Sequence, residues 1–101
     1  MYIATAFYPT VHASKYIGQL CKHFAHKVEV SWDETTGHAA LPSGPALLTA
    51  TPEGLSVRVE AQDAKGIIHA RFVIDSHLVN FAHREQFTGL DWTLERTGDP
   101  V

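Results

Sequence analysis

The sequence predicts an α+β fold, a two-layer sandwich in which two helices cover one face of a mainly antiparallel sheet. Two segments space their apolar residues as helices do, whereas the other segments alternate apolar and polar side chains with a period of two. Strands with one polar face are typical of antiparallel sheets that are covered on one side only. The predicted order is strand, helix, four strands, helix, strand.

The first third of the chain predicts one strand and one helix. Residues 2–8 alternate as a strand does, and Pro9 and Thr10 end it. A helix follows from about Val11 to Lys27, with Thr10 or Ser14 as its N-cap. Its buried stripe consists of residues at helical spacing, namely Ala13, Tyr16, Ile17, Leu20 and Phe24.

The rest of the chain predicts two hairpins, a helix and a last strand. The hairpin strands are 28–32, 38–41, 46–51 and 55–61, separated by turn-forming residues. Asp63 is the expected N-cap of a helix that runs to about Arg84 and buries Ile67, Ala70, Ile74, Leu78 and Phe81. The last strand spans 90–94, with Trp92, like Trp32 before it, at an inward position that favours core packing. Residues 96–101 are expected to fray.

Length and composition limit the possible functions. The chain has 101 residues, which predicts a single domain over 1–101. A formal net charge of -3 without a basic run argues against nucleic acid as a partner. No apolar stretch approaches the ~20 residues that a membrane helix needs, and the N-terminus has no evident signal peptide. The single cysteine, Cys21, fits a reducing compartment, so we expect a cytoplasmic protein.

Residues 20–27, LCKHFAHK, place one thiol and two imidazoles on the first helix. Because a helix advances about 100° per residue, Cys21 lies about +100° and His23 about -60° from Leu20. The two side chains therefore point to opposite flanks of the buried stripe and cannot share a metal ion. His23 and His26 are neighbours on the helix surface and would supply two of the four ligands of a zinc site, with the others from elsewhere. The alternative is that His26 is a solvated residue of the polar face and His23 a half-covered residue at the core boundary.

The second helix adds further polar candidates. His77 lies about -60° and Arg84 about -80° from Ile74, on the same rotational side as His23. If the two helices are antiparallel, His23 and His77 either face each other or both face away. Glu85 falls on the buried stripe, so either the helix ends before it or the carboxylate accepts hydrogen bonds from an arginine, a histidine or backbone amides. Arg84 and Glu85, with His77 and His83, form an alternative polar network that holds the last strand.

Two stretches together resemble a known family: YIGQLCKHFAHKVEV at 16–30 and HLVNFAHREQFTGLDW at 77–92. The chain resembles the uncharacterised bacterial family called domain of unknown function 2218, and is similar to a small domain appended to some siderophore-interacting flavoproteins. Asn80 departs from the family, where arginine is usual. The resemblance implies a bacterial domain associated with iron–siderophore handling, with an iron or siderophore reductase as a partner.

Three functions remain open. The leading hypothesis is a non-enzymatic binding or accessory module for a metal ion, an iron chelate or an anionic small molecule. Its candidate ligand-binding residues are His23, His77, Arg84, Glu85 and His26, and its candidate metal ligands are His23, His26 and His77. The alternatives are an enzyme in which His77 or His23 acts as general acid or base with help from Glu85, and a structural or interaction domain, including a homodimer. The sequence requires no cofactor.

Overall fold

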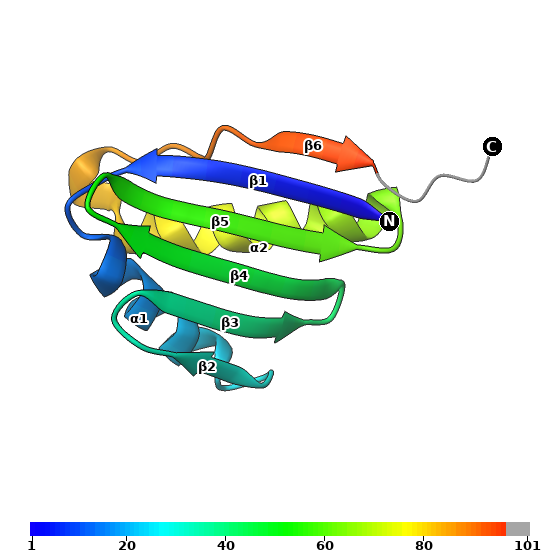
Figure 1. The fold of residues 1–101 in the computed structure, drawn as a ribbon, viewed down its shortest axis with the longest axis horizontal. Coiled ribbons are helices and arrows are strands. Elements are labelled where there is room, and N and C mark those ends of the chain that lie inside the picture. The colour runs from blue at the N-terminus through cyan, green and yellow to red at the C-terminus, as the bar shows by residue number, and fades with distance from the viewer. Residues whose placement is uncertain (97–101) are drawn as a thin grey trace.

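The computed structural model describes residues 1–96, with a six-stranded antiparallel sheet in the order β2-β3-β4-β5-β1-β6 (Figure 1). The elements are β1 (Tyr2–Pro9), α1 (Ala13–Phe24), β2 (Val30–Trp32), β3 (Thr36–Leu41), β4 (Gly44–Thr51), β5 (Gly54–Ala61), α2 (Ala64–Phe81), the 3₁₀ turn η1 (His83–Glu85) and β6 (Thr93–Arg96). Both helices lie behind the sheet in Figure 1, so one face is covered and the other is open. The predicted fold class and element order are confirmed.

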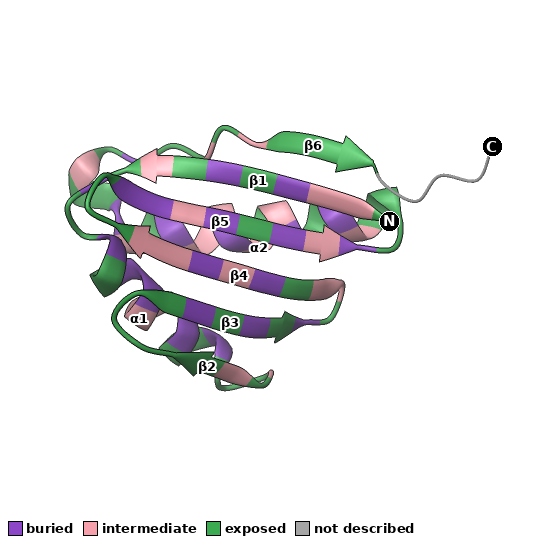
Figure 2. Ribbon diagram, in the orientation of Figure 1, coloured by how far each residue is buried: buried purple, intermediate pink, exposed green. Residues whose placement is uncertain are grey.

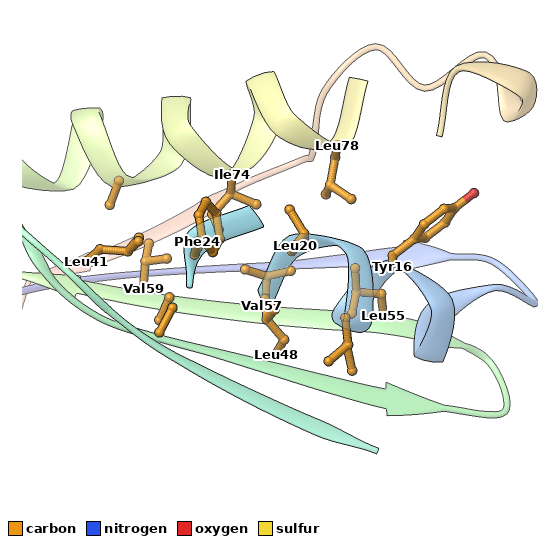
Figure 3. Close-up of a cluster of buried hydrophobic side chains, with 14 of the residues drawn as sticks. Tyr16, Leu20, Phe24, Leu41, Leu48, Leu55, Val57, Val59, Ile74 and Leu78 are labelled. Carbon is orange, nitrogen blue, oxygen red and sulfur yellow. The ribbon is translucent and has the colours of Figure 1, made fainter. Parts of the chain in front are cut away.

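The core lies between the sheet and the helices. Alternate residues of β4 and β5 point toward the helices, which produces the banding of buried and exposed positions in Figure 2. The largest fully buried side chains include Leu48, Leu55, Val57 and Val59 from the sheet and Leu20, Ile74 and Leu78 from the helices (Figure 3). Tyr16, Leu20 and Phe24 follow one another in Figure 3 in the direction opposite to that from Ile74 to Leu78, so the helices run roughly antiparallel.

Gly37 of β3 brings α1 close to the sheet. A Cβ atom at this position would lie 2.8 Å from Ile17 Cγ2 and 3.0 Å from Cys21 Sγ. The missing side chain therefore makes room for the buried stripe of α1. The contact explains why a glycine occupies an inward position in a strand, where glycine is otherwise unfavourable.

The first helix is shorter than predicted. Its N-cap is His12, which makes no side-chain capping bond, so the predicted caps Thr10 and Ser14 were wrong. Thr10 is instead buried, accepts a hydrogen bond from the His12 N–H at 3.0 Å and donates one to a distant carboxylate described below. The helix ends at Phe24, and the three residues before Val28 form a turn.

The second helix begins as predicted and ends earlier. Asp63 Oδ1 accepts a hydrogen bond from the Gly66 N–H at 2.7 Å, which confirms the cap. The helix ends at Phe81 rather than near Arg84, and η1 follows. Gln86 after it adopts the left-handed conformation, with φ of 59°. The interpretation in which the helix ends before Glu85 is therefore correct.

The last strand lies further along the chain than predicted. It spans Thr93–Arg96 rather than 90–94, because residues 90–92 bond to α2 and only the next residues pair with β1. Arg96 ends this strand, and the rest of the predicted frayed tail, residues 97–101, lies outside the described residues.

The two tryptophans differ in burial. Trp92 precedes β6 and is half-buried against the core, as the prediction of core packing requires, whereas the same prediction is wrong for Trp32. Trp32 pairs with inward-facing Gly37, but it lies on the edge strand β2 and is 41% exposed. An inward position on an edge strand is not covered when the nearest helix lies further inside the sandwich.

Candidate functional site

The imidazoles of His23 and His77 lie against each other between the two helices. Their ring centroids are 4.3 Å apart and the ring planes are tilted by 53°. His23 is exposed near the end of α1, whereas His77 is half-buried on α2. Of the two arrangements that the sequence left open for antiparallel helices, the structure has the one in which these flanks face each other. We call these two residues the inter-helix histidine pair.

Phe24 connects this pair to the core. It is 6% exposed, and its ring meets the His77 ring edge-on with a centroid distance of 5.2 Å. A buried aromatic side chain thus fixes the position of the His77 ring from one side. Cys21 lies on the other flank of the helix, where it is fully buried, and burial raises the pKa of its thiol. It therefore contributes packing rather than a thiolate to this region.

The backbone selects the tautomer of His77. Its Nδ1 lies 2.6 Å from the carbonyl oxygen of Val73, one turn earlier on α2. Because a carbonyl oxygen only accepts hydrogen bonds, Nδ1 carries the proton and Nε2 keeps its lone pair. This arrangement, in which one ring nitrogen donates to a carbonyl and the other is free, is the usual one for a metal-binding histidine.

The neutral form of His23 is favoured. Partial burial of the ring lowers the pKa of His23 below its ordinary value, and the nearby His77 imidazole acts in the same direction. His26 and Lys27 contribute smaller effects of the same sign. A neutral imidazole is the form that binds metal ions, so burial and the neighbouring ring keep His23 competent for binding to lower pH.

His26 lies at the edge of this region. Its ring centroid is 6.5 Å from that of His23, and its side chain is exposed. Across residues 1–96, no three histidine, cysteine, aspartate or glutamate side chains are grouped so that they could hold one metal ion. The structure therefore brings together two of the three histidines that were predicted as metal ligands, and His26 stays beside them.

Glu85 belongs to a second cluster, at the end of the sandwich where β1, α1 and η1 meet. Its carboxylate accepts hydrogen bonds from Thr10 Oγ1 at 2.8 Å, from Tyr8 Oη at 3.3 Å and from the hydroxyl of Tyr16. We call these four residues the Glu85 hydroxyl cluster. The helix ends before Glu85, and the carboxylate also accepts hydrogen bonds, but the donors are hydroxyls rather than the arginine, histidine or backbone amides of the second alternative.

The three hydroxyls stabilise the charged form of this carboxylate. Burial alone would raise the pKa of Glu85, but its hydrogen bonds to Tyr16, Thr10 and Tyr8 together lower it below the ordinary value, and nearby His12 adds to the effect. Burial and the same carboxylate raise the pKa values of both tyrosines. None of these phenols is activated for proton transfer near neutral pH, so the cluster has the properties of a structural connection.

Arg84 is exposed and forms no hydrogen bond or ion pair with any other residue in the range 1–96. The last strand is held instead by Asp75, which the sequence analysis missed. Its carboxylate accepts hydrogen bonds from the Leu90 N–H and from Trp92 Nε1, both at 3.0 Å, while Arg71 lies 6.0 Å from the centre of the Trp92 ring. The sequence signal for this role was the position of Asp75, an acidic residue directly after Ile74 of the buried stripe of α2.

The comparisons with known proteins agree with this fold. The sequence profile of a family described as an uncharacterized protein conserved in bacteria, DUF2218, matches residues 5–93. The chain belongs to the DUF2218 family. The matched span contains the inter-helix histidine pair, Glu85 and Asp75. No curated protein matches the chain.

A solved structure shares the fold of this DUF2218 chain. It is the NMR structure of PA4090 from Pseudomonas aeruginosa, which is 24% identical over 98% of this chain and all of that one, with a TM-score of 0.75. At that identity the likeness extends to the fold alone. In the part of the chain that the structure describes, neither helix is both long and apolar enough to cross a membrane.

Proposed function

We propose that this protein is a non-enzymatic binding module and that the inter-helix histidine pair binds a first-row divalent metal ion. The observation that carries the proposal is the 4.3 Å contact between the imidazoles of His23 and His77. Imidazole nitrogens suit zinc, copper, nickel and iron. Two imidazoles leave the other coordination positions to water or to an external ligand, as expected of a module that accepts a metal complex rather than enclosing the ion.

The order of the histidine pair supports this proposal. The Val73 carbonyl fixes the tautomer of His77, and Phe24 supports its ring. His23 projects from the last turn of α1, where it is exposed to an incoming ion. One ligand is thus held in place and the other is accessible.

The proposal includes an association with iron handling, which the family resemblance implies. Iron is among the metals that suit imidazole, and an iron chelate could supply the ligands that the protein lacks. A siderophore or iron reductase as partner, and a cytoplasmic location, belong to the same proposal. The free and buried Cys21 is compatible with a reducing compartment.

Acid–base catalysis by His77 or His23 has less support. Glu85, the carboxylate expected to assist, accepts hydrogen bonds from three hydroxyls that come from β1, α1 and the segment between them. Tyr16 precedes His23 by two helical turns, about 10 Å along the axis, so the two clusters lie at separate positions on α1. A histidine general base also requires a reacting group in reach, and among the described residues the pair has the Val73 carbonyl to orient His77 but no carboxylate or nucleophile grouped with it.

Metal titration of the untagged protein tests the proposal. Zinc, nickel and ferrous ions are added in turn, the last without oxygen, while NMR follows the imidazoles and calorimetry measures affinity. We expect selective changes at His23 and His77, and at least a tenfold weaker affinity in His23→Gln and in His77→Gln, since even outer-shell changes cost about 10-fold or more. His69→Gln is the matched control, because His69 is an exposed histidine elsewhere on α2. Equal weak shifts at all histidines, unchanged in the two variants, would reject the site.

A further inference from the structure

The open face of the sheet carries a feature that the helices and the histidine pair do not explain. Figure 1 is viewed onto this face. A hollow of about 620 Å³ lies over the middle strands and takes side chains from β1, β4, β5, β6 and the segment before β6. The register places Thr5 of β1 beside Arg58 of β5 and Phe7 beside Ser56. These side chains point outward, since the alternate residues Ala4 and Ala6 are buried.

Phe7 is the main apolar group of this hollow. It is 46% exposed, although its strand lies inside the sheet, and residues with free hydroxyl groups flank it. Thr5, Thr49, Ser56 and Thr93 all line the hollow, and none of their hydroxyls bonds to another group within residues 1–96. An exposed aromatic ring that is surrounded by free hydroxyls on a rigid sheet is a surface suited to a small polar ligand with an apolar body.

The charged side chains around Phe7 favour a ligand of one charge sign. Arg58, the only cationic side chain in the lining, is paired with Glu60 at 2.5 Å. Asp91 also lines the hollow and has no hydrogen bond or ion pair within the described residues. The uncompensated charge is therefore negative, and it lies in the segment that leads to Thr93, directly beside β1. An anion would meet Asp91 and a neutralised arginine, whereas a cation would meet a free carboxylate and an exposed aromatic ring.

We propose that the hollow on the open face binds a small organic ammonium compound, whose charge pairs with Asp91 and whose apolar part stacks on Phe7. Attraction of a cation to an aromatic face and pairing with an exposed carboxylate are each modest, so the hollow selects amines weakly and by charge. This site is independent of the histidine pair, because the sheet separates the open face from the helices.

Three matched probes test the proposal on the full chain: 2-phenylethylammonium, the neutral 2-phenylethanol and the anion phenylacetate. NMR titration should move amides of β1, β5 and residues 91–93 with the ammonium probe. We expect this probe to bind about two- to fivefold more tightly than the alcohol, with phenylacetate weakest. Added salt should reduce the preference for the cation.

Variants separate the two contributions. Asp91→Asn should reduce the preference for the ammonium over the alcohol, because only attraction to the Phe7 ring remains, and Phe7→Leu should weaken both. Glu95→Gln is the matched control, because it removes a carboxylate from β6, two residues beyond Thr93 and outside the lining of the hollow. Binding of phenylacetate as tight as that of the ammonium, an unchanged preference in Asp91→Asn, shifts outside the hollow, or no binding of any probe at millimolar concentration would each overturn the proposal. Metal binding by the histidine pair is measured separately and does not affect these outcomes.

Discussion

Replacing Glu85 with alanine should destabilise the protein far more than an exposed position would. The change leaves the hydroxyls of Tyr16 and Thr10 without their acceptor, and these residues are only 3% and 8% exposed. Each buried donor without a partner costs about 1–3 kcal/mol, whereas the half-buried Tyr8 can turn to water. We therefore expect a loss of about 2–6 kcal/mol, and the lower end corresponds to a fall in Tm of at least about 8 °C for a domain of this size.

Urea unfolding of four proteins measures this effect: the parent, Glu85→Ala, Tyr16→Phe and the double variant. If the carboxylate acts through its hydroxyl donors, removing the Tyr16 hydroxyl first should reduce the cost of losing Glu85, with a coupling of about 1 kcal/mol or more. Arg84→Ala is the control, and it should stay within about 0.5 kcal/mol because Arg84 is exposed and unpaired among the described residues. Additive single changes, or a loss no larger than that of Arg84→Ala, would refute the reasoning.

The same cluster gives a pH dependence of known sign. The pKa of Glu85 is lower in the folded protein than its ordinary value of 4.5, so the unfolded chain binds its proton more readily. The stabilisation is therefore fully present above pH 4.5 and is lost as the pH falls through the lower pKa of the folded state. The stability difference between the parent and Glu85→Ala should narrow in that acidic range and stay constant near neutral pH.

Three other outcomes are expected. Gly37→Ala should cost about 1–3 kcal/mol in urea unfolding, because the new Cβ meets the buried stripe of α1. Asp75→Ala should cost about 2 kcal/mol and shift the fluorescence of Trp92 toward that of a solvated indole, since both hydrogen bonds to residues 90–92 are lost; unchanged emission would contradict this role. In NMR titrations His23 should have a pKa below its ordinary 6.5, and His77→Ala should raise it; stability should then increase with pH just below 6.5, as the unfolded state binds the proton more readily.

The elements that follow from local rules were predictable from the sequence. Asp63 caps the second helix because its acceptor and the Gly66 N–H are three residues apart, and the alternation of β5 follows from a strand with one covered face. The buried stripe of α2 was correct from Ile67 to Leu78 for the same reason, since helical spacing alone defines it, and only Phe81 at the end of the helix is half-buried instead. In these cases the contacts that decide the structure lie within a few residues of each other.

The errors arose where partners distant in sequence decide the structure. Thr10 was assigned to a helix cap by its local context, but Glu85, 75 residues away, accepts its hydrogen bond. The start of β6 moved because Asp75 binds residues 90–92, which no strand pattern reveals. Trp32 lies on the inward side of its strand as predicted, but the position of β2 at the sheet edge leaves it exposed.

The inter-helix histidine pair was only partly predictable from the sequence. Helical geometry placed His23 and His77 on the same rotational flank of their helices. Whether the two imidazoles meet then depended on the relative direction of the helices and on whether these flanks face each other or face away. The sequence could not answer this, because strand order and crossover decide where α2 lies relative to α1. The hydrogen-bond donors of Glu85 could not be predicted either, because the fold decides that the end of β1, with Tyr8 and Thr10, lies beside Glu85.

The position of the histidine pair favours binding over a role in packing. Phe24 and Leu78 are buried beside it, so the core already holds the two helices together without any contribution from the exposed His23. If the pair served stability alone, a second imidazole placed where it lowers the proton affinity of His23 would be a poor choice against an apolar contact of the same size. As the metal ligands that we propose, the two rings have features that suit binding: His23 favours its neutral form and is open to an incoming ion, and the Val73 carbonyl fixes the His77 ring. Because α1 and α2 hold the two ring centroids 4.3 Å apart, the ion of the proposed function would meet two ligands that are already close together, which lowers the ordering cost of binding.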